Sequence, residues 1–104
     1  MLCGLVKELL KRVSEMEDIR VECTAAAGEL SAQLERMDTL KERMGRLFRY
    51  YGSEAWFADR EAELPEGTKA GVLSEDLVYD EILSLRDTAI HMLELATDLL
   101  KNHI

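Results

Sequence analysis

The first half of the chain is one long heptad pattern, LCGLVKELLKRVSEMEDIRVECTAAAGELSAQLERMDTLKERMGRLFRYY, over residues 2–51. Hydrophobic residues recur in alternating steps of four and three, and only Arg20 and Lys41 interrupt them. The seam consists of Leu2, Val6, Leu9, Val13, Met16, Arg20, Cys23, Ala27, Leu30, Leu34, Met37, Lys41, Met44, Phe48 and Tyr51. Such a sustained repeat predicts an α-helix over about 2–51. Apolar residues beside the seam, among them Leu5 and Ile19, widen the stripe, which favours a bundle with several neighbours.

A single glycine, Gly28, is the one place where this helix can reverse. The surrounding segment, CTAAAGE over residues 23–29, contains no proline, and the heptad phase continues through it. A glycine within a helix costs only ~1 kcal/mol relative to alanine, which packing on either side can offset. We therefore expect a continuous helix, with a reversal at Gly28 and a three-helix bundle as the alternative.

The second half of the chain is predicted to contain shorter helices than the first. Gly52 suits the left-handed position after a helix, and Ser53 suits the cap of a short helix over about 54–62. The LPEG sequence lies in a turn over 63–73, and Ser74 caps a last helix over about 75–102. We predict an all-α fold with a single domain over 1–104, in which a long, a short and a second long helix form an antiparallel helical hairpin.

Four short segments follow one another in a distinctive order in this second half. They are YYGSEAW (50–56), LPE (64–66), GVLSED (71–76) and MLELA (92–96). Together they resemble a bacterial family catalogued as domain of unknown function 4298, most strongly over residues 50–96, while the long helix is similar in pattern only. The resemblance implies no activity, cofactor or site residue.

Composition and charge narrow the classes of partner. The 104 residues carry a net charge of −8, which opposes binding to nucleic acid and to anionic membrane surfaces. No uncharged run approaches the ~20 residues of a membrane span, and the first residues lack a basic signal-peptide region. Cys3 and Cys23 are ~30 Å apart on one helix, so they cannot form a disulfide within a chain. We expect a cytoplasmic protein with free thiols.

Catalytic and metal-binding patterns are weak. His91 and His103 are the two histidines, and neither follows a glutamate at the Glu-x-x-His spacing of a di-metal bundle. Ser53 and Ser74 are interpreted as helix caps, and Cys23 lies in the helix seam without an activating neighbour. We expect no enzyme activity, no cofactor and no metal site.

The turn between the two long helices is the most distinctive chemical feature, because it gathers most of the aromatic residues next to a basic helix end. Its candidate residues, for partner binding or for closing the core, are Arg46, Arg49, Tyr50, Tyr51, Trp56 and Phe57. Basic residues among aromatics can bind single-stranded nucleic acid. Many acidic residues follow directly, however, so we expect the basic end of the first helix to meet the acidic start of the last.

The two long helices differ in length, about 72 Å against about 42 Å. In a hairpin the last helix covers the first only to about residue 24, which leaves an apolar stripe uncovered. The candidate dimer interface is Leu2, Leu5, Val6, Leu9, Val13, Met16 and Ile19, with Leu10 beside it. A soluble chain seldom leaves such a stripe in water. We expect an elongated helical homodimer, whose register Arg20 helps to set.

Two functions are consistent with these features. The first is a non-catalytic interaction protein, a dimeric scaffold or adaptor that recognises an unidentified protein partner. The alternative is a small acidic inhibitor or accessory factor that occupies a basic site, such as a nucleic-acid channel, on its partner. Salt discriminates between them, because acidic mimicry weakens steeply as ionic strength rises and apolar docking does not.

Overall fold

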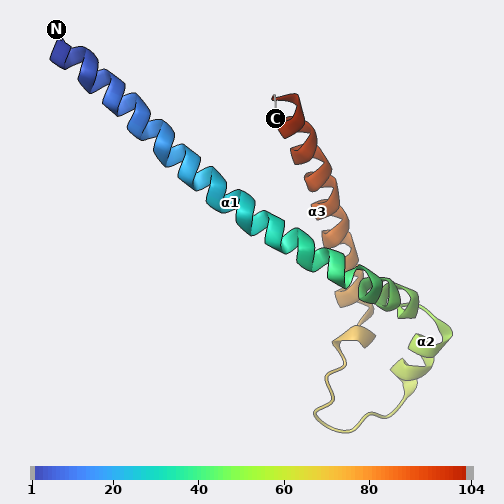
Figure 1. Cartoon of the computed structure of the whole chain (residues 1–104). Helices are drawn as coiled ribbons and strands as arrows, with labels where there is room; N and C mark the ends of the chain where they lie inside the picture. The colour runs from blue at the N-terminus through green and yellow to red at the C-terminus, as the bar shows by residue number, and fades with distance from the viewer. Residues whose placement is uncertain (1, 103–104) are drawn as a thin grey trace. The chain divides into compact units, whose positions relative to one another are not determined.

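The computed structural model describes residues 2–102, in which helices follow one another in the order long, short, long (Figure 1). α1 spans Leu2–Tyr50, α2 spans Glu54–Glu61 and α3 spans Glu75–Lys101. No strand occurs in residues 2–102. The predicted all-α class with two long helices is therefore confirmed.

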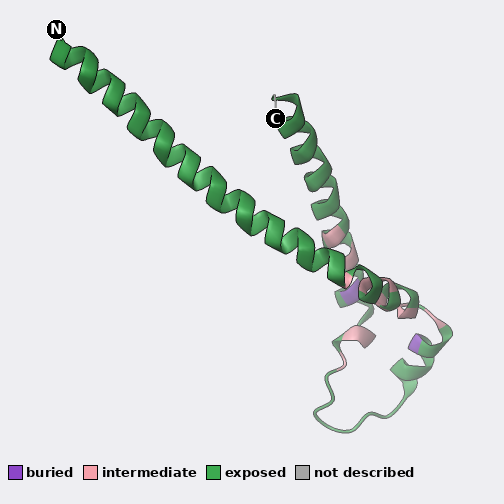
Figure 2. Ribbon diagram, in the orientation of Figure 1, coloured by how far each residue is buried: buried purple, intermediate pink, exposed green. Residues whose placement is uncertain are grey.

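The chain divides into two compact units, residues 1–44 and residues 45–104. The described part of the N-terminal unit is helical throughout and belongs to α1. α1 continues without a break through Gly28, where an added Cβ would meet no atom within 4 Å. The expected continuous helix is confirmed, and the alternative of a reversal at Gly28 is excluded. No residue of α1 is buried (Figure 2).

The end of α1 and the start of α2 follow the predicted pattern. Gly52 has φ of +77°, a left-handed conformation in which a Cβ is strained. The Tyr51 N–H donates to the Leu47 carbonyl at 3.0 Å, and the Ser53 N–H donates to the Tyr50 carbonyl at 3.0 Å. The Ser53 hydroxyl then accepts from the Trp56 N–H at 3.2 Å, which caps α2. A single Gly-Ser pair thus ends one helix and begins the next.

The connection to α3 contains more structure than the predicted turn over 63–73. Gly67 has φ of +83°, and the Thr68 N–H donates to the Pro65 carbonyl at 3.1 Å, so the LPEG segment is a turn as expected. A 3₁₀ turn, η1 (Gly71–Leu73), follows it and was not anticipated. Ser74 caps α3 as predicted, its hydroxyl accepting from the Leu77 N–H at 3.2 Å.

The core of the C-terminal unit is small. Trp56 of α2 and Val78 of α3 are the buried residues among the described part of the chain (Figure 2). Around them Leu47, Val72 and Ile82 are half-buried. Because so few side chains are fully enclosed, a large share of this unit's packing depends on Trp56.

Gly52→Ala should lower the free energy of unfolding by about 1–2 kcal/mol, because a Cβ in the left-handed region clashes with the backbone. Gly28→Ala is the matched control, and it should raise stability by up to ~1 kcal/mol, because its helical site is open. Urea denaturation followed by circular dichroism measures both changes. Equal midpoints for the two variants would contradict the assigned conformation of Gly52.

Candidate functional site

The aromatic turn, defined as Tyr50, Tyr51, Trp56 and Phe57 with the basic residues beside them, lies within the C-terminal unit. Trp56 is 2% exposed, whereas its neighbour Phe57 is 55% exposed. Tyr50 and Tyr51 are half-buried, and Arg46 and Arg49 are exposed. The six candidates therefore separate into one enclosed residue, two partly covered phenols and three residues that solvent reaches.

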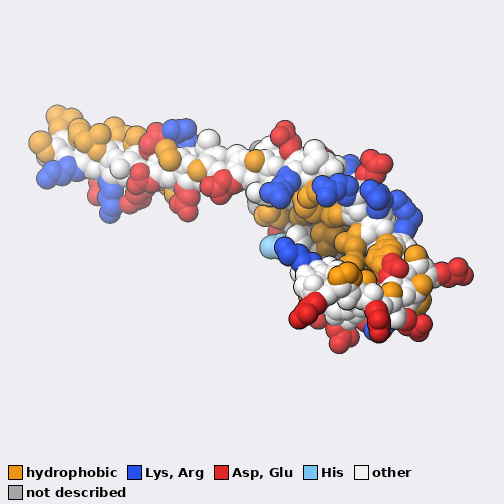
Figure 3. Space-filling model, turned by 90° about the horizontal axis from the view of Figure 1, so that it is seen from below, with side chains coloured by type: hydrophobic (Ala, Val, Ile, Leu, Met, Phe, Trp, Pro, Cys, Tyr) orange, Lys and Arg blue, Asp and Glu red, His pale blue; other side chains and the backbone are white. Residues whose placement is uncertain are grey.

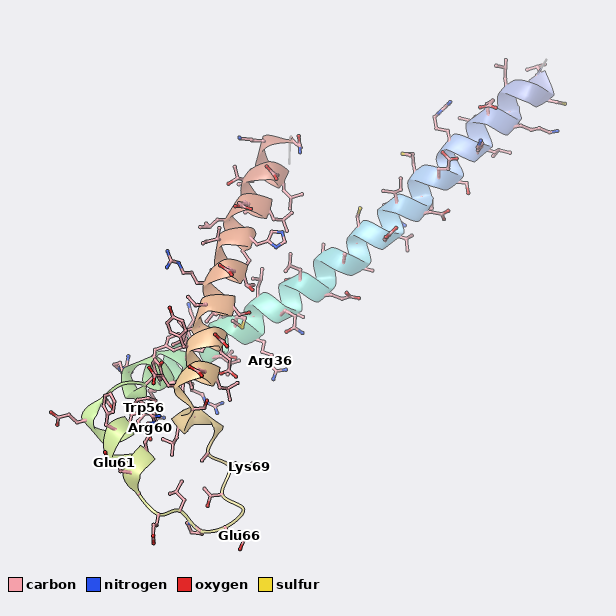
Figure 4. All side chains as sticks on the ribbon, turned by 180° about the vertical axis from the view of Figure 1, so that it is seen from behind. Arg36, Trp56, Arg60, Glu61, Glu66 and Lys69 are labelled. Atoms are coloured by element: carbon pink, nitrogen blue, oxygen red, sulfur yellow. The ribbon has the colours of Figure 1, made fainter. Side chains whose placement is uncertain are left out.

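Three side chains surround the Trp56 indole. Tyr51 and Phe57 each lie with ring centroids 5.0 Å from Trp56, at interplanar angles of 70° and 78°. These edge-to-face arrangements are favourable beyond the area that they bury. The Arg60 guanidinium lies 4.7 Å from the ring centroid, beside Trp56 on α2 (Figure 4). We did not single out Arg60 from the sequence, although its i,i+4 spacing from Trp56 on a helix was a usable signal.

Two hydrogen bonds connect the turn to the segments that follow it. The Trp56 indole Nε1–H donates to the Val72 carbonyl at 2.9 Å, which joins α2 to η1. The Tyr51 hydroxyl donates to the Glu75 carbonyl at 3.2 Å, which joins the end of α1 to the start of α3. A buried indole N–H without an acceptor would be destabilising, so the Val72 carbonyl is what permits Trp56 to be enclosed. Both acceptors are backbone atoms, which residue types do not reveal.

Tyr50 forms a separate contact with α2. Its hydroxyl donates to Asp59 Oδ2 at 2.5 Å, in an exposed position. This hydrogen bond to a carboxylate favours the protonated phenol and raises the pKa of Tyr50 above its ordinary value of 10.0, and partial desolvation and the negative charge of Asp59 act in the same direction. Tyr50 is therefore a neutral donor at physiological pH.

The expected charge contact at the turn is made by a different residue. Arg60 Nη1 lies 4.0 Å from Glu75 Oε2, so the acidic start of α3 meets a basic residue of α2. Arg46 and Arg49 form no ion pair with any carboxylate of residues 2–102. An exposed pair at this distance contributes little to stability. The arginines near the end of α1 thus remain available on the surface.

The candidate dimer stripe lies on the N-terminal unit. Leu2 is 78% exposed and Leu9 is 47% exposed, and the other stripe residues lie between these values. Figure 3 shows apolar side chains gathered along one edge near the N-terminal end of α1, with most of the charged groups on the opposite edge and some beside the apolar ones. A shallow, open surface depression lies at the margin of the stripe. It is lined by Arg12, Val13, Met16, Glu17 and Arg20.

Other candidate groups show no convergence. Among residues 2–102, no three His, Cys, Asp or Glu side chains are placed to hold a metal ion. His91 is exposed, and His103 lies outside the described residues. Cys3 and Cys23 are free and exposed. Of the helices that the structure describes, none combines the length and apolarity that crossing a bilayer requires.

Comparison with known proteins gives one match. A family model described as "Domain of unknown function (DUF4298)" matches residues 13–95. This range includes the aromatic turn, the whole of α2 and η1, and most of α1 and α3. No curated protein matches the chain, and no solved structure does.

Trp56→Ala should reduce the free energy of unfolding by about 3–5 kcal/mol, as expected for removal of a buried indole. Phe57→Ala is the matched control on the same helix, and it should have a much smaller effect because Phe57 is exposed. Native fluorescence of Trp56 should be blue-shifted and poorly quenched by iodide. A Trp56→Ala variant that denatures like the wild type, with a freely quenched indole in the parent, would show that the turn is open to a partner.

The stability contributed by the Tyr50–Asp59 hydrogen bond should depend on pH at the alkaline end. The folded-state pKa of Tyr50 is raised, so the contribution is fully present below the unfolded value of about 10 and is lost as pH rises through the folded value. Asp59→Ala should lower the pKa of Tyr50 toward 10.0, as measured by NMR of Cζ-labelled tyrosine. Glu61→Gln, which removes a charge from α2 but not the hydrogen bond, is the control. An unchanged Tyr50 pKa in Asp59→Ala would contradict the contact.

Proposed function

The chain belongs to the family described as Domain of unknown function (DUF4298), and we propose that it is a protein-interaction protein without catalytic activity of its own. It acts as a scaffold or adaptor that pairs with a second copy through the apolar stripe of the N-terminal unit. Its free thiols suit a reducing compartment such as the cytoplasm.

The observation that carries this proposal is the exposure of eight large apolar side chains on one segment of α1. They are Leu2, Leu5, Val6, Leu9, Leu10, Val13, Met16 and Ile19, each between 47% and 78% exposed. Burying one such side chain contributes ~1.5–3 kcal/mol, so the stripe represents on the order of 12 kcal/mol before the existing burial is discounted. Isolated apolar residues on a surface need no explanation, but a contiguous stripe of this size is typical of an interface.

The non-catalytic part of the proposal is supported by the use that the fold makes of its polar groups. The hydroxyls of Ser53 and Ser74 cap helices, and the Tyr51 hydroxyl and Trp56 indole N–H bind backbone carbonyls. Each of these groups is already committed to holding the C-terminal unit together. Self-association then joins two such units in one particle, which is the arrangement that a scaffold needs.

Light scattering during size-exclusion chromatography should give twice the chain mass of 11.8 kDa at micromolar concentration. Met16→Lys should raise the dimer dissociation constant about a hundred-fold or more, because two copies each lose ~1.5 kcal/mol or more of apolar burial. Ser14→Lys places the same charge on the opposite face of the helix and should leave the dissociation constant unchanged. A monomeric wild-type chain, or equal effects of the two lysines, would contradict the proposal.

A further inference from the structure

We infer that the second copy lies parallel to the first and in register with it over residues 2–23, in a two-stranded coiled coil. This inference rests on the proposed self-association and adds its orientation, register and number of strands. It is carried by three features of α1: the residue types at the seam, the depression around Met16, and the charges that flank it.

The seam residues have the shapes that a parallel pair favours. In heptad notation, Val6 and Val13 occupy a positions, and Leu2, Leu9 and Met16 occupy d positions. β-branched residues at a with leucine at d favour two parallel strands. The apolar residues beside the seam fit the same arrangement, because Leu5 at g and Leu10 at e face each other across a parallel interface. Ile19, the other apolar residue at a g position, lies opposite Thr24 in the same arrangement.

The surface depression has the composition of a coiled-coil hole. Val13, Met16, Glu17 and Arg20 are successive a, d, e and a residues, the four that surround a knob from the facing helix. In a parallel pair in register, that knob is Met16 of the second copy. Methionine is unbranched and adapts to irregular spaces, so it suits a depression whose rim includes two arginines. An antiparallel pair also has knobs and holes, so the flanking charges decide the orientation.

The charges at g and e favour the parallel orientation. A g residue lies opposite the e residue five positions later on a parallel partner, which places Arg12 against Glu17 in two symmetric pairs. The antiparallel register that best covers the stripe, over residues 2–20, places Arg12 against Arg12. Shifting that register by one heptad opposes Glu17 to Leu10, and a further heptad opposes Glu17 to Glu17. Opposite charges therefore meet across the interface in the parallel arrangement and not in these alternatives.

Arg20 at an a position fixes the register. In the structure its Nε donates to Glu17 Oε1 on the same helix, which holds the guanidinium at the edge of the seam. A carboxylate can accept several hydrogen bonds, so Glu17 can also accept from Arg12 of the second copy. In register, Arg20 lies opposite its own copy at the margin of the seam, where each guanidinium turns outward to Glu17 of its own helix. A slip of one heptad would instead place the two Arg20 side chains opposite Val13 and Ala27, where a charge faces an apolar residue. Register and orientation are thus set by the same three charged residues.

Cys23 provides the decisive experiment, because it occupies a d position and lies opposite its own copy in a parallel pair. The full chain with Cys3→Ser is treated with diamide, which takes up two electrons and two protons as two Cys23 thiols join. The linked dimer should form about ten-fold faster or more than in Cys23→Ser, where Cys3 lies at e, outside the seam. Non-reducing electrophoresis measures it, and denaturing urea should abolish the difference.

A charge exchange tests the same arrangement without a thiol. Arg12→Glu and Glu17→Arg should each weaken self-association about ten-fold, while an equimolar mixture of the two variants should associate nearly as tightly as the wild type. In the mixture every flanking pair again joins opposite charges. Circular dichroism of both variants should show unchanged helix content, which separates these effects from loss of the helix. A mixture no tighter than the single variants would overturn the parallel pairing.

The outcomes separate this inference from the proposed function. A dimer by light scattering in which Cys23 does not link faster than Cys3 overturns the parallel register and leaves self-association standing. A mass of three or more chains overturns the two-stranded assignment. A monomer removes both proposals.

Discussion

An α-helix satisfies its own backbone hydrogen bonds but cannot bury its own apolar side chains, and this constraint governs both units of the chain. The C-terminal unit meets it by bringing α2, η1 and α3 together around Trp56, which is almost wholly enclosed. The N-terminal unit consists of a helix that carries a continuous apolar stripe with no buried residue. The C-terminal unit buries apolar side chains within one chain, whereas the helix of the N-terminal unit can bury its stripe only against another surface.

In the C-terminal unit, the polar and aromatic side chains that could bind a partner are the same ones that stabilise the fold. Several side chains at the turn could in principle bind a ligand or react. Each of them, namely the indole, the phenols and the capping hydroxyls, has a defined hydrogen-bond partner within the fold. Trp56 donates to a backbone carbonyl of η1 and packs against Tyr51, Phe57 and Arg60. A partner for this region would therefore contact the residues left exposed, Phe57 and the arginines at the end of α1, and not the indole.

In the N-terminal unit, the side-chain shapes in the seam and the charges beside it specify an orientation for the proposed dimer, which apolar character alone does not. In the proposed dimer, apolar burial supplies most of the free energy of association but does not distinguish one orientation from another. Arg12, Glu17 and Arg20 do distinguish them, because each position at the margin of the stripe faces a different residue in each arrangement. The family match begins at Val13, so it includes Val13, Met16, Glu17 and Arg20 of the depression but not Arg12.

The sequence by itself determined the class of fold, the continuity of α1 and the helix boundaries near Gly52, Ser53 and Ser74. These features are local, since they depend on heptad spacing, on the conformational freedom of glycine and on side chains that cap their own helix. Only the tertiary structure decided that Trp56 is enclosed while Phe57 is not, that the indole binds the Val72 carbonyl, and that Arg60 meets Glu75 where Arg46 and Arg49 do not. Those contacts join residues up to 16 positions apart through backbone atoms and through rotamers, and neither is encoded in residue type or spacing.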